Sequence, residues 1–201
     1  FFKLCEGNQF SNLSEESEAR WKLVETAWNL QLNPNMIVSF DENKEVLFIE
    51  DFSMKRTEIT SARSALNGYQ KGKCFYSFKD LRLKENLNCD VDHVLPHLNK
   101  SSHYYSKYPA NINGVWNLVL ADKDINRHEK RAKFPAKKYM ERLFRRNEYY
   151  ITSKHPLSET IINQTGKTAA ERLNFLNFHW NIAKENCVIE FSAFELAENK
   201  F

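Results

Sequence analysis

The chain has 201 residues, of which 42% are hydrophobic and 27% are charged, with only five glycines and five prolines. This length suits one large domain, or one domain with an appended lobe, and excludes a multi-domain machine. The composition excludes a disordered or fibrous chain, because enough apolar surface is available to offset the entropy lost on ordering. No apolar stretch approaches the roughly 18 residues that a membrane span needs, so we expect a soluble, cytoplasmic protein with no membrane partner.

The first residue is Phe rather than Met, so we expect the sequence to be a piece of a longer chain. The four cysteines, at positions 5, 74, 89 and 187, include no C-x-x-C pair. Zinc knuckles and redox dithiols both need such pairs, so we expect free, mostly buried thiols.

Residues 1–72 are expected to form a lobe that packs on the rest of the chain. Its predicted elements are a helix over 16–32, strands over 36–40 and 46–52, and a helix over 57–70. Apolar residues recur every three or four positions in the first helix, at Trp21, Val24, Trp28 and Leu32. The proline at position 34 ends that helix.

The middle segment, 73–135, reads as strand, long loop, strand and helix. The first strand is Cys89-Asp90-Val91-Asp92-His93-Val94-Leu95-Pro96, and the second is Val115-Trp116-Asn117-Leu118-Val119-Leu120. The helix is predicted over 122–133. Segment 136–201 is expected to be a helical extension of the same domain, with three helices over about 135–148, 156–164 and 167–186. The last of these carries a core face of Leu173, Leu176, Trp180 and Ala183.

The net charge of +3 is unevenly distributed along the chain. Residues 11–50 carry eight acids and three bases, whereas residues 126–146 carry nine bases and two acids. Phe134, Tyr139 and Phe144 alternate with the bases of the second stretch. This pattern is typical of a surface that binds a phosphate backbone, although a solvated helix face gives the same composition.

The pieces V-D-H-V-L-P, W-N-L-V-L-A and I-N-R-H-E-K-R-A-K-F-P, in this order and at these spacings, resemble the ββα-metal module of HNH endonucleases. The resemblance implies an α+β fold in which an HNH core over 73–135 is flanked by helices and by the N-terminal lobe of helix and hairpin. It covers about 60 residues of the chain.

The resemblance also implies roles for individual residues. His93 would be the general base that takes a proton from water, because an imidazole with an ordinary pKa of about 6.5 suits that step at neutral pH. Asp92 and Asn126 would bind one divalent cation, with Mg²⁺ as the expected ion and Mn²⁺ as the alternative. Asn117 would serve catalysis structurally, its amide tying down the loop after the first strand and orienting His93. Phosphate contacts would come from the basic stretch: Arg127, His128, Lys130, Arg131, Lys133, Lys137 and Lys138.

Two features depart from the family pattern. Many HNH proteins have zinc-binding C-x-x-C pairs before the first strand and at the start of the helix, and this chain has neither, so we expect no structural zinc. The family usually has a Lys three residues after the helix Asn, whereas Lys130 comes four after Asn126. With that register open, His128 is an alternative ligand or phosphate contact.

The sequence therefore predicts a metal-dependent HNH endonuclease that hydrolyses DNA. Two alternatives stay open: a nucleic-acid-binding module whose nuclease centre is degenerate, and an HNH nuclease that cleaves RNA. By analogy with the family, we expect a role in bacterial restriction or antiviral defence, with a sensor or ATPase domain or subunit as partner.

Overall fold

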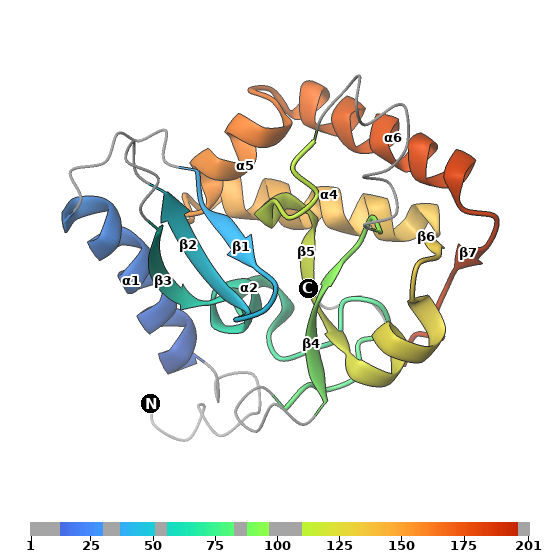
Figure 1. Cartoon of the computed structure of the whole chain (residues 1–201), viewed down its shortest axis with the longest axis horizontal. Coiled ribbons are helices and arrows are strands. Elements are labelled where there is room, and N and C mark those ends of the chain that lie inside the picture. The colour runs from blue at the N-terminus through green and yellow to red at the C-terminus, as the bar shows by residue number, and fades with distance from the viewer. Residues whose placement is uncertain (1–12, 30–36, 51–55, 83–87, 97–109, 197–201) are drawn as a thin grey trace.

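The computed structural model describes residues 13–29, 37–50, 56–82, 88–96 and 110–196. Helices and strands are mixed, as the predicted α+β class requires (Figure 1). Within these ranges, no helix is long and apolar enough to cross a membrane.

The N-terminal lobe is an antiparallel sheet with two helices packed beside it. The strands β1 (Ser39–Asp41), β2 (Val46–Glu50) and β3 (Arg56–Ser61) are paired in that order. The helices are α1 (Leu13–Asn29) and α2 (Ala62–Gln70). The prediction of one helix over 57–70 is wrong in its first part, because 56–61 is β3. Ile59 is buried between more exposed neighbours, and this alternation suits a half-buried strand.

Helix α1 buries a different face from the predicted one. Ala19 and Leu23 are buried, whereas Trp21 and Val24 are 58% and 39% exposed. Small Ala19 allows α1 to lie close to α2, and at Gly68 a Cβ atom would collide with the carboxyl group of Glu16. Of the other two predicted core positions, the side chain of Trp28 and all of Leu32 lie outside the described part of the chain.

The middle segment follows the predicted order of strand, strand and helix. Strand β4 (Cys89–His93) pairs antiparallel with β5 (Leu118–Asp122), so that Asp92 lies opposite Val119 and His93 lies opposite Leu118. A 3₁₀ turn, η3 (Val115–Asn117), leads into β5, and the helix η4 (Ile125–Lys130) follows it. Helix η4 is a π-helix, and the N–H of Arg131 donates to the carbonyl of Asn126 at 2.9 Å. The prediction for 97–109, a polar loop between the strands, lies outside the described residues.

The strands β4 and β5 are called the hairpin from here on. Three C-terminal helices follow it in the chain, close to their predicted positions. They are α4 (Lys137–Thr152), α5 (Ser158–Thr165) and α6 (Ala169–Asn186). Helix α6 begins with a capping box in which Thr168 and Glu171 bond each other's backbone N–H groups. On its predicted core face, Leu176 and Ala183 are buried, but Leu173 is 40% exposed. A short parallel pair, β6 (Phe134–Pro135) and β7 (Glu190–Phe191), was not predicted.

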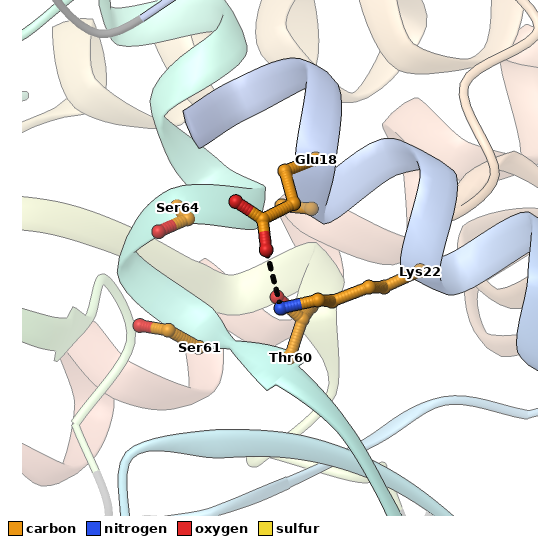
Figure 2. Close-up of a pocket in the computed structure, with 6 residues that line it drawn as sticks. Glu18, Lys22, Thr60, Ser61 and Ser64 are labelled. Atoms are coloured by element: carbon orange, nitrogen blue, oxygen red, sulfur yellow. Dashed lines mark ion pairs between the residues drawn. The ribbon is translucent and has the colours of Figure 1, made fainter. Parts of the chain in front are cut away.

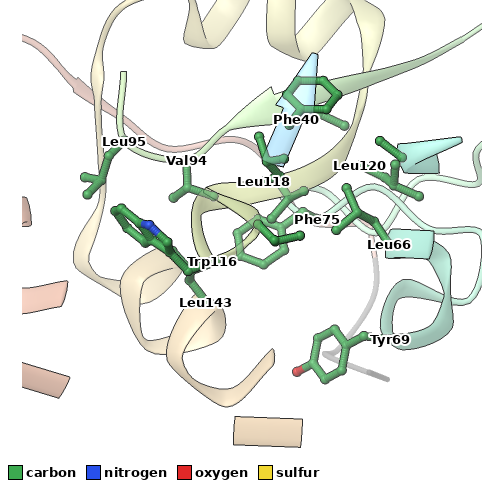
Figure 3. Close-up of a cluster of buried hydrophobic side chains, with 14 of the residues drawn as sticks. Phe40, Leu66, Tyr69, Phe75, Val94, Leu95, Trp116, Leu118, Leu120 and Leu143 are labelled. Carbon is green, nitrogen blue, oxygen red and sulfur yellow. The ribbon is translucent and has the colours of Figure 1, made fainter. Parts of the chain in front are cut away.

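Buried side chains from all three segments form one hydrophobic core. Phe40 of β1 and Leu66 of α2 share it with Trp116 and Leu118 around β5 and with Leu143 of α4 (Figure 3). Because the core is continuous, the N-terminal sheet is packed directly against the hairpin that carries Asp92 and His93.

Two arginines counted in the predicted phosphate-binding stretch belong to this interior. Arg142 and Arg146 are 4% and 2% exposed. The guanidinium of Arg142 donates to the backbone carbonyl of Phe75 and to Glu195. Neither arginine can extend a surface track along α4, which corrects the expectation for 137–146.

Two buried histidines should make the fold sensitive to acid. Burial lowers the pKa of His155 to about 3 and that of His179 to about 4. An unfolded histidine takes up a proton near pH 6.5, so the unfolded chain binds more protons below that pH, and stability falls as the pH drops towards 4. At pH 5, His155 alone should cost about 2 kcal/mol of unfolding free energy.

Melting temperatures measured from pH 7 to pH 5 test this expectation. The variant His155→Asn should lose less stability over this range than the wild type. The exposed His128→Asn variant serves as the control and should follow the wild type. Parallel curves for His155→Asn and the wild type would show that His155 is not the group responsible.

Candidate functional site

Asn117 is fully buried, and its amide holds the segment that follows β4. Its Oδ1 accepts a hydrogen bond from the N–H of Leu95 at 2.9 Å. Its Nδ2 donates to the carbonyls of Leu95 at 3.1 Å and Ile112 at 3.0 Å. The amide therefore ties the turn after β4 to η3, the structural contact that the sequence predicts for it. Its contribution to catalysis stays a prediction.

Helix α4 fixes the turn that carries Asn117. The buried guanidinium of Arg146 donates to the carbonyls of Val115 at 3.1 Å and Trp116 at 3.0 Å. Asn147 also donates to the carbonyl of Trp116, at 3.2 Å. Burial lowers the pKa of the Arg146 guanidinium. These bonds satisfy the carbonyls of η3 and hold Asn117 at the start of β5.

Asp92 points from β4 towards η4, where it meets a buried ammonium group. The Nζ of Lys130 lies 3.2 Å from Oδ1 and 3.0 Å from Oδ2 of Asp92, and it donates to the carbonyl of His93 at 2.6 Å. The hydroxyl of Tyr76 donates to Oδ2 of Asp92 at 2.6 Å. Burial, followed by the charge of Asp92, raises the pKa of Tyr76 well above its usual value. The carboxylate of Asp92 is thus neutralised and hydrogen-bonded within the fold.

The π-helical turn brings Lys130 to this position. In a π-helix the backbone bonds span five residues, so each turn takes up more residues than an α-turn. Lys130 lies at the end of this turn, on the side of η4 that faces β4.

Asn126 and Arg127 contact Asp90 rather than Asp92. The guanidinium of Arg127 holds Asp90 through two bonds, with Nε at 2.8 Å from Oδ2 and Nη2 at 2.9 Å from Oδ1. The Nδ2 of Asn126 donates to Oδ2 of Asp90 at 3.3 Å. Asp90 raises the pKa of Arg127 by hydrogen bonding and by its charge. Helix η4 thus runs along β4, with its first turn at Asp90 and its end at Asp92.

His93 lies on the opposite face of β4 from Asp92, because successive side chains of a strand alternate. It is 8% exposed and packs beside Phe40, with ring centroids 6.0 Å apart. Its Nε2 lies 3.6 Å from Oε1 of Glu42, in the turn after β1. The predicted general base therefore faces the N-terminal sheet.

The structure places Asp92 and His93 on β4 and Asn126 on η4, but it does not join Asp92 and Asn126 around a shared space. Carboxylate and amide oxygens are suitable ligands for a hard divalent cation. In this arrangement, however, Asp92 is bonded to Lys130 and Asn126 is bonded to Asp90, so the pair does not fit a cation held between them. In the ranges that the structure describes, no three His, Cys, Asp or Glu residues are arranged to hold a metal.

The predicted phosphate-binding residues divide by exposure. Lys130 is 1% exposed and paired, so it cannot be a surface contact, which corrects that prediction. Lys133 is partly buried, and Lys138 pairs with Glu195 at 2.9 Å. The members with exposed side chains are Arg127, His128, Arg131, Lys137 and Lys138.

Sequence reasoning missed three residues of this region. Asp90 has a signal, since it lies two residues before Asp92 and so shares its face of the strand. Tyr76 and Glu42 have none that is local, because they reach the site only through the packing of distant segments.

A separate polar hollow lies where α1 meets β3 and α2 (Figure 2). It is lined by Glu18, Lys22, Thr60, Ser61 and Ser64, and Glu18 pairs with Lys22 at 2.7 Å. Besides Ala19, the lining consists of hydroxyls and one exposed ion pair, in which the charge of Glu18 is balanced by Lys22.

Searches against protein-family models, curated proteins and solved structures returned no match.

The ion pair of Lys130 and Asp92 should be strongly coupled. Replacing Lys130 by Met leaves the Asp92 charge buried and unpaired, which should cost about 3–5 kcal/mol of unfolding free energy. The double variant Lys130→Met, Asp92→Asn should lose less than the sum of the two single changes. Urea denaturation of the four proteins measures this coupling. The exposed pair Glu18 and Lys22 is the control and should show a much weaker coupling, because water screens its charges. Additive effects at Lys130 and Asp92 would contradict the observed contact.

The three hydrogen bonds of the Asn117 amide, called the Asn117 clamp, should also contribute to the free energy of unfolding. Asn117→Ala removes three hydrogen bonds and leaves buried backbone groups unpaired, so we expect a loss of about 2–4 kcal/mol in urea denaturation. Asn181→Ala, on the exposed side of α6, should change stability by about 0.5 kcal/mol or less. Equal effects of the two changes would rule out the clamp.

Proposed function

We propose that the chain is an HNH-type endonuclease that hydrolyses phosphodiester bonds of DNA. One observation carries this proposal. An antiparallel hairpin ends its first strand in Asp92-His93, begins its second strand at the Asn117 clamp, and is followed by a helix that lies along the first strand. This is the order of elements that the resemblance to the HNH module implies.

In the proposed reaction, His93 acts as the general base. Its imidazole accepts a proton from a water molecule, and the resulting hydroxide forms a bond to phosphorus. The bond from phosphorus to the leaving oxygen breaks, and that oxygen takes a proton from a second water molecule. The buried carbonyl of His93 is held by Lys130, and the turn after it is held by Asn117, so the base has a fixed backbone. Such positioning is a large part of catalysis of phosphoryl transfer.

The substrate would be held by exposed bases of the same region. Arg131 lies at the end of η4, and Lys137 lies at the start of α4. Contacts of this kind position a nucleic acid without reading its sequence. Asp92 and Asn126, as they are bonded here, do not fit the expected Mg²⁺ or Mn²⁺, so no step of the proposed reaction is assigned to that cation.

A second candidate is a nucleic-acid-binding module with a degenerate nuclease centre. The contact of Lys130 with Asp92 favours it, because an internal ammonium already neutralises the carboxylate predicted to bind the cation. The setting in antiviral defence and the sensor or ATPase partner belong to the first candidate by analogy with the family.

Plasmid cleavage distinguishes the two candidates. With Mg²⁺ or Mn²⁺ present, the wild type should nick or cut supercoiled DNA, and His93→Gln should reduce the rate by at least about 100-fold. Asn181→Ala should cleave like the wild type, and circular dichroism should show that each variant is folded. Salt-sensitive DNA binding with no cleavage in any divalent ion would support the degenerate module instead. Unchanged cleavage by folded His93→Gln would refute the assigned base, and faster cleavage of total RNA than of plasmid would assign RNA as the substrate.

A further inference from the structure

We infer that Glu42, in the turn between β1 and β2, is a positioning residue for His93, so that the N-terminal sheet completes the nuclease site. This inference rests on the proposed function. The direct observation is that Oε1 of Glu42 lies 3.6 Å from Nε2 of His93, with Phe40 of the same strand beside the imidazole ring.

Strand β1 is attached to the hairpin region by its backbone. Ser39 forms an antiparallel bridge with Gly114, just before η3. The N–H of Val38 donates to Oγ1 of Thr160 in α5 at 3.0 Å. Val38 and Phe40 are buried in the shared core. These contacts fix the position of the end of β1, and therefore the position of Glu42, which is the next residue.

The turn that carries Glu42 is itself ordered by side-chain bonds. Oδ1 of Asp41 accepts from the N–H groups of Asn43 at 3.0 Å and Lys44 at 3.2 Å. The N–H of Ala62, at the start of α2, donates to the carbonyl of Glu45 at 3.0 Å. The backbone on both sides of Glu42 is thus held, which is what a residue needs in order to orient another side chain.

The contact affects which nitrogen of the His93 imidazole carries the proton. A carboxylate that faces Nε2 favours the tautomer with the proton on Nε2. The lone pair is then left on Nδ1, the nitrogen that would act as the base in the proposed reaction. At 3.6 Å the contact is longer than a hydrogen bond, so it acts on the ring through the charge of the carboxylate.

The experiment uses the whole chain and two readouts. Glu42→Ala removes the charge and the acceptor, and Glu42→Gln restores an acceptor oxygen. For plasmid cleavage we expect kcat to fall about tenfold in Glu42→Ala and less in Glu42→Gln, with KM for DNA within about twofold of the wild type. Nitrogen-15 NMR of the His93 ring at about pH 8 should show that Glu42→Ala loses the preference for a proton on Nε2.

Glu50→Ala is the matched control, because Glu50 is an exposed carboxylate of the same sheet that pairs with Arg56 instead of His93. If Glu42→Ala matches this control in both kcat and the His93 spectrum, the inference is overturned. If the wild type does not cleave DNA but the His93 spectrum still depends on Glu42, the proposed nuclease function fails and the positioning contact is supported.

Discussion

The arrangement of the site depends on one buried ammonium group. Lys130 is 1% exposed, and its Nζ bonds both the carboxylate of Asp92 and the carbonyl of His93. Burying a charge is costly unless it is paired and hydrogen-bonded, and here both partners come from the end of β4. The contact therefore sets where η4 lies along the strand. It also presents a positive charge at the carboxylate from which the sequence predicts metal binding, and so it bears on both candidate functions.

Other acids of the hairpin are paired with bases in the same way. Each of three buried strand carboxylates is met by a base from outside the hairpin: Asp90 by Arg127, Asp92 by Lys130, and Asp122 by Lys79 at 3.0 Å. The acids of β4 and β5 can therefore be buried without leaving unpaired charge. On the other face of β4, His93 meets the N-terminal sheet. The two faces of β4 therefore differ: on one face carboxylates are paired with bases, and on the other the imidazole of His93 packs beside Phe40.

The features that could be predicted from the sequence are those that residues close together in the chain determine. The apolar runs beside Asp92 and Asn117 predicted the two strands, and the spacing of polar residues predicted the helix after them. Residues 57–61 were misassigned because a short alternating run leading into a helix has no clear start signal. In α1, the spacing of the large residues suggested the wrong face, since Ala19 and Leu23 are buried whereas Trp21 and Val24 are exposed. The contacts of Asp92 with Tyr76 and of His93 with Glu42 could not be predicted, because they depend on how distant segments pack.

We propose that a phosphodiester bond is cleaved at the end of β4, where His93 lies between the segment held by Asn117 and the N-terminal sheet. A crystal structure of the protein with a DNA duplex tests it most directly. The account predicts a phosphate group within reach of the His93 imidazole through one water molecule, with flanking phosphates near Arg131 and Lys137. DNA bound with every phosphate remote from His93 would contradict it.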